Sequence, residues 1–271
     1  MNLRARLKPW VEVKTLIRPN YLEKISDVQG NSSLLCVHGL NQNPSCLRPL
    51  LRDIEPFGYE AYLLHLPGHR DLYSSYEPLL PHFFSTALLD ASAHLLERYG
   101  KPPLFVGYSF GGLLGVLNAD QILFSKMILL APALRLRFYA HLLRPTLPFV
   151  KKIKSVSLHD SRLEQKYRFY QNGVPSEIYK SFFCFYSQLH KKDKSYLRKT
   201  KGLVFSHPND ELVSFSSLNS WVRNYTDWSR LTLNNSQAEF CAYNHLCFDK
   251  QTLGERSYNK LISDIYEFIC D

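Results

Sequence analysis

The sequence lacks a long apolar run. No window of about 18 uncharged apolar residues occurs in the 271-residue chain, so no transmembrane helix is predicted. The N-terminus carries Arg4, Arg6 and Lys8 without an apolar stretch behind them, which is not the pattern of a secretory signal. The six cysteines contain no C-x-x-C pair, which argues against a disulfide framework and against a zinc site. Together these absences predict a cytoplasmic protein with reduced cysteines.

The motifs of several metal- and cofactor-dependent enzymes are also missing. No H-E-x-x-H pair is present, which argues against zinc hydrolysis. No G-K-[ST] follows the glycines, as a P-loop would require, and the spacing of Gly111, Gly112 and Gly115 is not that of a dinucleotide-binding loop. The sequence therefore predicts no metal and no cofactor.

Apolar residues are plentiful. They make up 45% of the chain, with 17 Phe and 17 Tyr, and can fill a sizeable core. Short apolar runs typical of buried strands alternate with segments of helical periodicity, which predicts an α/β protein whose mostly parallel central sheet is flanked by helices. Strands are expected at residues 33–37, 60–64, 104–106, 126–131, 202–205 and 231–233, with an opening hairpin inside residues 1–32 around Val11, Val13 and Leu16. Helices are expected near residues 47–55, 82–99, 215–222 and 252–269 and directly after Ser109.

A serine occupies a turn in residues 103–114, which read P-P-L-F-V-G-Y-S-F-G-G-L. A buried strand is expected before this turn and a helix after it. Ser109 is the centre of a G-x-S-x-G motif, whose glycines permit a turn sharp enough to expose the hydroxyl at a helix N-terminus. The free N–H groups of that terminus can stabilise a developing oxyanion. The motif alone occurs in many unrelated chains, but its strand–turn–helix setting favours a nucleophile over an idle turn serine.

Motif and setting together resemble the α/β-hydrolase family, serine-nucleophile branch. The resemblance covers nearly the whole chain outside one segment described below, and it implies an α/β-hydrolase fold with a helical cap inserted after the sixth strand. The sequence His38-Gly39-Leu40 resembles the loop that completes the family's oxyanion hole. By this resemblance, the backbone N–H groups of Leu40 and Phe110 are the two donors. The imidazole of His38, and that of His69 in a Pro-Gly-His turn, are interpreted as structural.

An acid and a base are predicted from chain order. Asp210 follows the expected strand at 202–205, as the family's acid does, and can accept a hydrogen bond from a histidine Nδ1–H. Glu211 and Asp227 are competing acids, and Asp210 could instead cap the helix at 215–222. His245 is the only one of the ten histidines that follows these acids. The order Ser109, Asp210, His245 is that of α/β hydrolases, so these residues are predicted to be catalytic, although the loop before His245 is longer than in the family.

Residues 134–199 differ in composition from the rest of the chain. They contain 15 Lys and Arg against 4 Asp and Glu, a local charge of +11, whereas the remainder carries −2. By the resemblance they form a basic, aromatic-rich helical cap over Ser109, and residues 1–133 and 200–271 form the hydrolase core. Ordinary packing on the core is an alternative interpretation of the cap's aromatic stripe, and a solvated surface is the alternative for its charge. The stripe consists of Ile178, Phe182, Phe185 and Leu189, widened by Phe183 and Tyr186.

The sequence therefore predicts a serine hydrolase that cleaves carboxylic esters through an acyl-enzyme, with an apolar acyl group, similar to carboxylesterases and monoacylglycerol lipases. A small-molecule acyl ester is the expected partner. The basic cap leaves open an anionic substrate, as for an acyl thioesterase or lysophospholipase, and peptidase or carbon–carbon-bond chemistry is possible on this fold. A further alternative is a catalytically inert scaffold that binds a partner or an anionic membrane through the cap. Nucleic acid is not expected, because such a binder has no use for Ser, Asp and His in this order.

Overall fold

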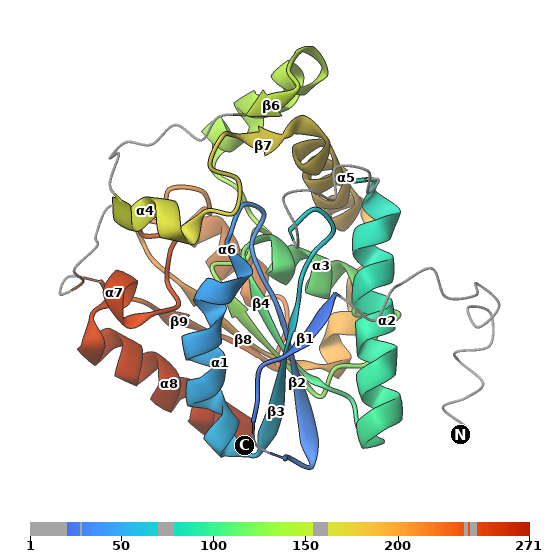
Figure 1. The fold of residues 1–271 in the computed structure, drawn as a ribbon, viewed down its shortest axis with the longest axis vertical. Helices are drawn as coiled ribbons and strands as arrows, with labels where there is room; N and C mark the ends of the chain where they lie inside the picture. Colours follow the sequence, from blue (N-terminus) through green and yellow to red (C-terminus); the bar gives the residue numbers. More distant parts are fainter. Residues whose placement is uncertain (1–20, 28, 70–78, 154–161, 236–237, 239–242) are drawn as a thin grey trace.

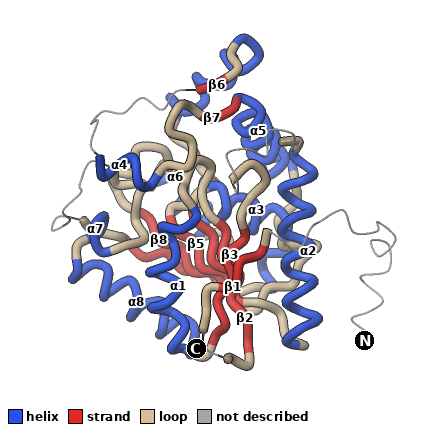
Figure 2. Tube along the Cα trace, in the orientation of Figure 1, coloured by secondary structure: helices blue, strands red, loops and turns tan. Residues whose placement is uncertain are grey.

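The computed structural model of the chain describes residues 21–27, 29–69, 79–153, 162–235, 238 and 243–271. Its centre is a seven-stranded sheet (Figure 2), in which β1 (Leu22–Lys24) is antiparallel to β3 (Tyr59–Leu64) and all other neighbours are parallel. The mostly parallel sheet confirms the predicted fold class. The strand order is β1 (Leu22–Lys24), β3 (Tyr59–Leu64), β2 (Ser32–Val37), β4 (Leu104–Tyr108), β5 (Lys126–Leu130), β8 (Lys201–Ser206) and β9 (Trp228–Thr232).

Helices cover both faces of this sheet (Figure 1). Alternate side chains of a strand point to opposite faces, and because the inner strands are apolar on both faces, both must be shielded from water. In β2, Leu34 and Cys36 belong to one core, and Leu35 and Val37 to the other. The first core is closed by α1 (Arg48–Ile54), flanked by the short turns η2 (Pro44–Leu47) and η3 (Glu55–Phe57), and by α8 (Glu255–Cys270). The second is closed by α2 (Pro81–Tyr99), α3 (Phe110–Asn118) and α6 (Phe215–Val222).

Two expected elements differ from the observed ones. The last strand, β9, starts three residues before the expected 231–233, because Trp228 pairs with Gly202 and its ring fills the space where a side chain at that glycine would lie. The expected closing helix is two helices, α7 (Lys250–Leu253) and α8, separated by Gly254 at φ 78°, a conformation that favours glycine. The hairpin expected around Val11, Val13 and Leu16 lies outside the described residues.

The described parts of residues 134–199, which are 134–153 and 162–199, follow β5, and most of them lie in the upper part of the molecule in Figure 1. Five described strands precede this segment; the predicted sixth depends on the hairpin outside the described residues. The helix α5 (Ser176–Lys191) packs against α3 and α2, and β6 (Lys152–Ile153) forms a short antiparallel pair with β7 (Val174–Pro175). The elements are η4 (Phe138–Phe149), β6 (Lys152–Ile153), α4 (Arg162–Tyr167), β7 (Val174–Pro175), α5 (Ser176–Lys191) and η5 (Ser195–Lys199).

Candidate active site

Ser109 lies in the sharp turn between β4 and α3. Its backbone has φ 48° and ψ −109°, a conformation that a residue other than glycine rarely adopts. The turn is held from both sides, because the Ser109 N–H donates to the Leu130 carbonyl (2.9 Å) and the Ser109 carbonyl accepts from the Ala133 N–H (3.0 Å). Gly111 permits the close approach of α3 to β2, since a Cβ there would lie 2.1 Å from the Val37 carbonyl oxygen. This geometry presents the Ser109 hydroxyl at the N-terminus of α3.

Asp210 lies in the loop after β8 and is fully buried. Its Oδ1 accepts hydrogen bonds from the N–H groups of Leu212 and Val213, both at 2.8 Å. Burial favours the protonated acid, but the charge of His245 when it is protonated, the hydrogen bond to it and the backbone donors outweigh burial, so the pKa of Asp210 is lowered. Asp210 therefore carries a negative charge with one oxygen free to face a histidine.

The structure brings His245 between Ser109 and Asp210. Its Nδ1 lies 2.8 Å from Asp210 Oδ2, and its Nε2 lies 2.9 Å from Ser109 Oγ. Because Nδ1 faces a carboxylate, which only accepts, the neutral ring carries its proton on Nδ1 and leaves Nε2 to accept from the serine hydroxyl. Burial lowers the pKa of His245, but the charge and hydrogen bond of Asp210, together with the charge of Glu211, raise it above its ordinary value.

The structure distinguishes the alternatives to Asp210 as the acid that binds His245. The cap of α6 is Ser214, whose side chain accepts from the Ser217 N–H, so Asp210 does not cap that helix. Glu211 binds the backbone of the histidine loop instead of the imidazole, and Asp227 precedes β9 on the surface. Only Asp210, of the three acids, is hydrogen-bonded to the ring of His245.

The backbone N–H groups of Leu40 and Phe110 are the predicted oxyanion donors. Within the described residues neither the Leu40 N–H nor the Phe110 N–H has a hydrogen-bond partner. A free amide at a helix N-terminus or in an adjoining loop can stabilise negative charge on a reacting oxygen. Both are the residues predicted from the sequence, and Gly39 places the Leu40 loop beside Ser109, since a Cβ at Gly39 would lie 3.4 Å from Ser109 Cβ.

Two buried histidines hold that loop. His38 Nδ1 donates to the Gly39 carbonyl (2.7 Å) while its Nε2 accepts from the Leu66 N–H (3.0 Å). The Nε2 of His69 is hydrogen-bonded to the Leu40 carbonyl. Burial, which opposes charge, lowers the pKa of His38 and lowers that of His69 to about 4. Both imidazoles are therefore neutral and tie the loop to the Pro-Gly-His turn, as the structural interpretation expects.

Sequence reasoning missed two residues of this site. Tyr108 OH donates to the His245 carbonyl (3.1 Å), and its ring packs against that imidazole at a centroid distance of 5.4 Å. Gln42 Oε1 accepts from the Gly39 N–H (2.9 Å) and so supports the loop that carries Leu40. Neither has a sequence signal of its own, because Tyr108 fills a variable position of the G-x-S-x-G motif and Gln42 lies in an irregular loop.

The aromatic stripe of α5 packs on the core next to this site. Phe182 and Phe185 lie 5.5 and 6.0 Å, between ring centroids, from the buried ring of Phe110, and Phe185 also meets Phe84 of α2. Core packing, the alternative interpretation, accounts for this part of the stripe. The segment 134–199 thus contacts the helix that begins directly after Ser109.

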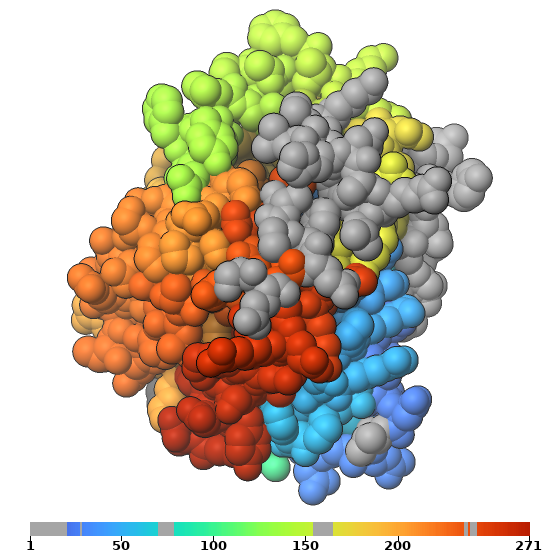
Figure 3. Space-filling model, turned by 90° about the vertical axis from the view of Figure 1, so that its left-hand side faces the viewer, coloured from blue at the N-terminus to red at the C-terminus, as the bar shows by residue number. Residues whose placement is uncertain are grey.

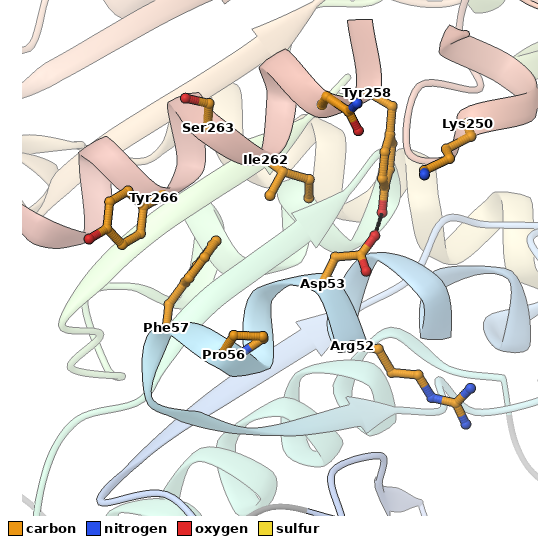
Figure 4. Close-up of a pocket in the computed structure, with 10 residues that line it drawn as sticks. Arg52, Asp53, Pro56, Phe57, Lys250, Tyr258, Ile262, Ser263 and Tyr266 are labelled. Carbon is orange, nitrogen blue, oxygen red and sulfur yellow. Dashed lines mark hydrogen bonds between the residues drawn. The ribbon is translucent and has the colours of Figure 1, made fainter. Parts of the chain in front are cut away.

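A surface depression of about 520 Å³ lies elsewhere, between α1, η3 and α8 (Figure 4). Its side chains come from α1, η3, α7 and α8, and Tyr258 OH donates to Asp53 (2.7 Å) across it. Ser109, Asp210 and His245 do not line it. Among the described residues, no group of three or more His, Cys, Asp or Glu is arranged to hold a metal ion.

Comparison with known proteins gives one family and many similar folds. Residues 34–231 match the family described as "Alpha/beta hydrolase family", a range that includes Ser109 and Asp210 and ends before His245. No curated protein sequence matches the chain. Solved structures below 25% identity show similarity of fold alone. One, from work on the metagenome-derived lipolytic enzymes LipS and LipT, has a TM-score of 0.69 at 17% identity and covers 94% of this chain and 99% of that chain.

Two monoacylglycerol lipases have similar folds. A soluble variant of the monoglyceride lipase from Saccharomyces cerevisiae, in complex with a substrate analogue, has a TM-score of 0.66 at 13% identity and covers 92% of this chain and 89% of that one. The monoacylglycerol lipase from Paleococcus ferrophilus has a TM-score of 0.64 at 16% identity and covers 92% of this chain and 98% of that chain.

Proposed function

The chain belongs to the α/β-hydrolase family, and from that premise we propose that it is a serine hydrolase that cleaves carboxylic esters. The observation that carries the proposal is the continuous hydrogen-bonded path from Ser109 Oγ through His245 to Asp210, with contacts of 2.9 and 2.8 Å. A serine hydroxyl is a weak nucleophile unless a base removes its proton, and a histidine held by a carboxylate supplies that base.

The proposed reaction consists of acylation of Ser109 followed by hydrolysis of the acyl-enzyme. Ser109 Oγ attacks the acyl carbonyl carbon while its proton passes to His245 Nε2, and the N–H groups of Leu40 and Phe110 bind the resulting oxyanion. The intermediate collapses to the acyl-enzyme, and the imidazolium gives its proton to the departing alcohol. A water molecule then loses a proton to His245 and attacks the acyl carbon; Ser109 recovers the proton as the acid leaves.

We propose an apolar acyl group, because the part of the chain around the residue after the serine is rich in aromatic side chains. Phe110, whose N–H is one proposed oxyanion donor, lies among Phe84, Phe182 and Phe185. We propose that residues 134–199 form the cap and that residues 1–133 and 200–271 form the core. Lipolytic enzymes and monoacylglycerol lipases are among the solved structures of similar fold, and for this reason we propose ester hydrolysis first, with the thioesterase and lysophospholipase reactions as alternatives.

Covalent labelling with a fluorophosphonate tests the nucleophile. The wild-type chain is expected to label, and peptide mapping is expected to place the label on Ser109. Ser109→Ala should lose the label, while Ser125→Ala, which changes an exposed serine, should keep it. A folded wild-type chain that does not label would support the alternative of an inert binding scaffold. A panel of p-nitrophenyl esters of increasing chain length, beside acyl-CoA and monoacylglycerol, then identifies the acyl group and the leaving group.

A contact with an anionic membrane is the second candidate, and the surface of η4 favours it. Phe138 and Phe149 are 80% and 87% exposed, and Tyr139 and Leu142 of the same element are also exposed. Exposed apolar side chains gathered on one element are unusual on a protein that meets only water. Cations exposed on or directly after η4 are Arg144, Lys151 and Lys152. This part of the chain protrudes at the top of the space-filling view (Figure 3).

Apolar side chains beside cations are the chemistry of peripheral binding to anionic lipid. None of the described helices is long and apolar enough to cross a bilayer. We expect the chain to sediment with phosphatidylcholine vesicles that contain phosphatidylserine, and less so as salt increases. Replacing Phe138 and Phe149 together with Ser should weaken binding, while Leu123→Ser, another exposed apolar position, should not. If the bound fraction changes neither with the phosphatidylserine content nor with the salt concentration, an electrostatic role of the cap is excluded.

A further inference from the structure

The carboxylate of Glu211 lies across two consecutive backbone amides of the loop that carries His245. Its Oε1 accepts from the Asn244 N–H (3.0 Å) and from the Asn244 side-chain amide (2.7 Å). Its Oε2 accepts from the His245 N–H (3.1 Å). Three donors therefore converge on one side chain, and two of them are peptide groups at and directly before the histidine.

Two consecutive acids therefore bind His245, one through its imidazole and the other through its backbone N–H. Asp210 holds the imidazole of His245 through Oδ2, and Glu211 holds the backbone of that residue. An imidazole bound only by its ring could still shift with its backbone. With both ends bound to one short loop, the ring has a defined distance to Ser109.

Other contacts of the described residues also hold the histidine loop. Among the described residues between β9 and α7 there is no helix or strand. The Asn244 side chain is also hydrogen-bonded to the Asn209 carbonyl (3.2 Å) and to Asn235 (3.0 Å), and Tyr108 OH donates to the His245 carbonyl. Glu211 is the only one of these partners that carries a negative charge, and charge-assisted hydrogen bonds are the stronger kind.

We infer that Glu211 is a positioning residue of the esterase reaction, which acts through His245 and not on the substrate. It fixes the backbone at His245 so that Nε2 stays within reach of Ser109 Oγ, and its charge favours the imidazolium that forms when the serine loses its proton. The inference rests on the proposed function.

The charge effect can be separated from the other groups near the ring. Asp210 is hydrogen-bonded to the imidazole and Glu211 to the backbone N–H of the same residue; the charges of both raise the pKa of His245 against the lowering effect of burial. Tyr108 faces it from β4 and is kept neutral, because burial raises the pKa of that phenol. His207 lies near both acids, with a pKa lowered mainly by burial, and the Nε of Arg137 donates to the Asp210 carbonyl. Removing the charge of Glu211 should therefore lower the pKa of His245, since one of its two anionic neighbours is lost.

The test compares Glu211→Gln and Glu211→Ala with wild type in ester hydrolysis across pH. Glutamine keeps the shape of the side chain but loses its charge, and its NH₂ group lies against one of the N–H donors. Alanine removes the hydrogen bonds to Asn244 and His245 altogether. We expect kcat to fall about 10-fold for Gln and up to about 100-fold for Ala, with KM within about twofold of wild type. The pH at which kcat/KM is half-maximal on the acid side should fall in both variants. Asp227→Asn, an exposed acid outside the loop, is the matched control and should change neither quantity.

Unchanged kcat in both folded variants, or an unchanged pH midpoint, would overturn the inference. Thermal unfolding identifies a merely structural role, in which stability falls but the pH midpoint of the remaining activity does not move. If Glu211→Ala does not fold, kcat and the pH midpoint of Glu211→Gln alone decide whether the inference holds. Failure of the proposed function is distinguishable, because the wild-type chain would then neither label with fluorophosphonate at Ser109 nor hydrolyse esters.

Discussion

The Nε of Arg137 donates a hydrogen bond of 2.6 Å to the backbone carbonyl of Asp210, 73 residues later in the chain. The Arg137 Nη2 lies 3.4 Å from the Pro208 carbonyl oxygen. The backbone N–H of Arg137 donates to the Leu212 carbonyl (2.9 Å). The start of the segment proposed as the cap is thus tied to the loop that carries the acid. A displacement of one is expected to disturb the other.

Arg137→Ala should reduce both stability and activity. A hydrogen bond from a charged donor contributes about 1.5–3 kcal/mol, and loss of about 1 kcal/mol lowers the melting temperature by about 2–4 °C in a chain of this size. We expect a melting temperature several degrees lower and a several-fold lower kcat, because Asp210 loses a support. Arg144→Ala, at an exposed position of η4, is the control. Wild-type values of both quantities in Arg137→Ala would contradict the coupling.

Gly111→Ala should displace the turn at Ser109. The added Cβ would lie 2.1 Å from the Val37 carbonyl oxygen, so α3 and β2 must separate. We expect the free energy of unfolding to fall by about 1–3 kcal/mol and fluorophosphonate labelling to slow sharply. Gly58→Ala is the contrast, because its φ of 94° is strained for alanine but no atom lies within 4 Å of the new Cβ. It should cost about 1 kcal/mol and leave labelling intact. Normal labelling in folded Gly111→Ala would contradict this account of the turn.

Ester hydrolysis should increase with pH as His245 loses its proton. Protonated His245 cannot accept the proton of Ser109, and the anions beside it raise its pKa, so the acid-side midpoint of kcat/KM is expected above 6.5. Asp210→Asn removes the closer anion and the acceptor that selects the ring tautomer; it should lower that midpoint and reduce kcat by about 10⁴-fold. A wild-type midpoint well below 6.5 would argue against His245 as the base.

Glu60 should stabilise the fold in a pH-dependent way. This buried carboxylate accepts from Tyr99, from Tyr62 OH (3.0 Å) and from the Gly30 N–H (3.2 Å), and pairs with Lys24 (3.2 Å). Burial raises its pKa, but these partners outweigh burial and lower the pKa to about 2. Because the folded pKa lies below the ordinary 4.5, the contribution is complete above pH 4.5 and is lost as pH falls toward 2.

Urea unfolding of Glu60→Gln checks this expectation. The variant should be less stable than wild type at pH 7 by about 1–3 kcal/mol, and the difference should shrink at pH 3. Glu97→Gln, an exposed acid on α2, should match wild type at both pH values. An equal difference between Glu60→Gln and wild type at pH 7 and pH 3 would show that the charge of Glu60 is not responsible.

Local chemistry determined much of this protein. The apolar runs of the inner strands predicted their positions to within about two residues, because a strand buried on both faces needs a continuous apolar sequence. The G-x-S-x-G turn could be placed for a similar reason, since its glycines are required by close contacts such as that of Gly111 with Val37. Chain order then singled out His245, and the local composition singled out residues 134–199. The shift of β9 and the break at Gly254 were not predictable, because a neighbouring strand and one backbone angle decide them.

Only the tertiary structure decided how the two adjacent acids divide their roles. Asp210 and Glu211 are consecutive and chemically alike; the resemblance to the family's acid loop favours Asp210 as the acid, but it gives Glu211 no role of its own. In the folded loop the N–H groups of Leu212 and Val213 bind Asp210 Oδ1 and aim its other oxygen at the imidazole, while Glu211 meets the backbone of the following loop. The hydrogen bond from Arg137 to the Asp210 carbonyl likewise arises between segments far apart along the chain. Directional bonds between distant segments depend on how the backbone folds, and residue types alone do not encode that geometry.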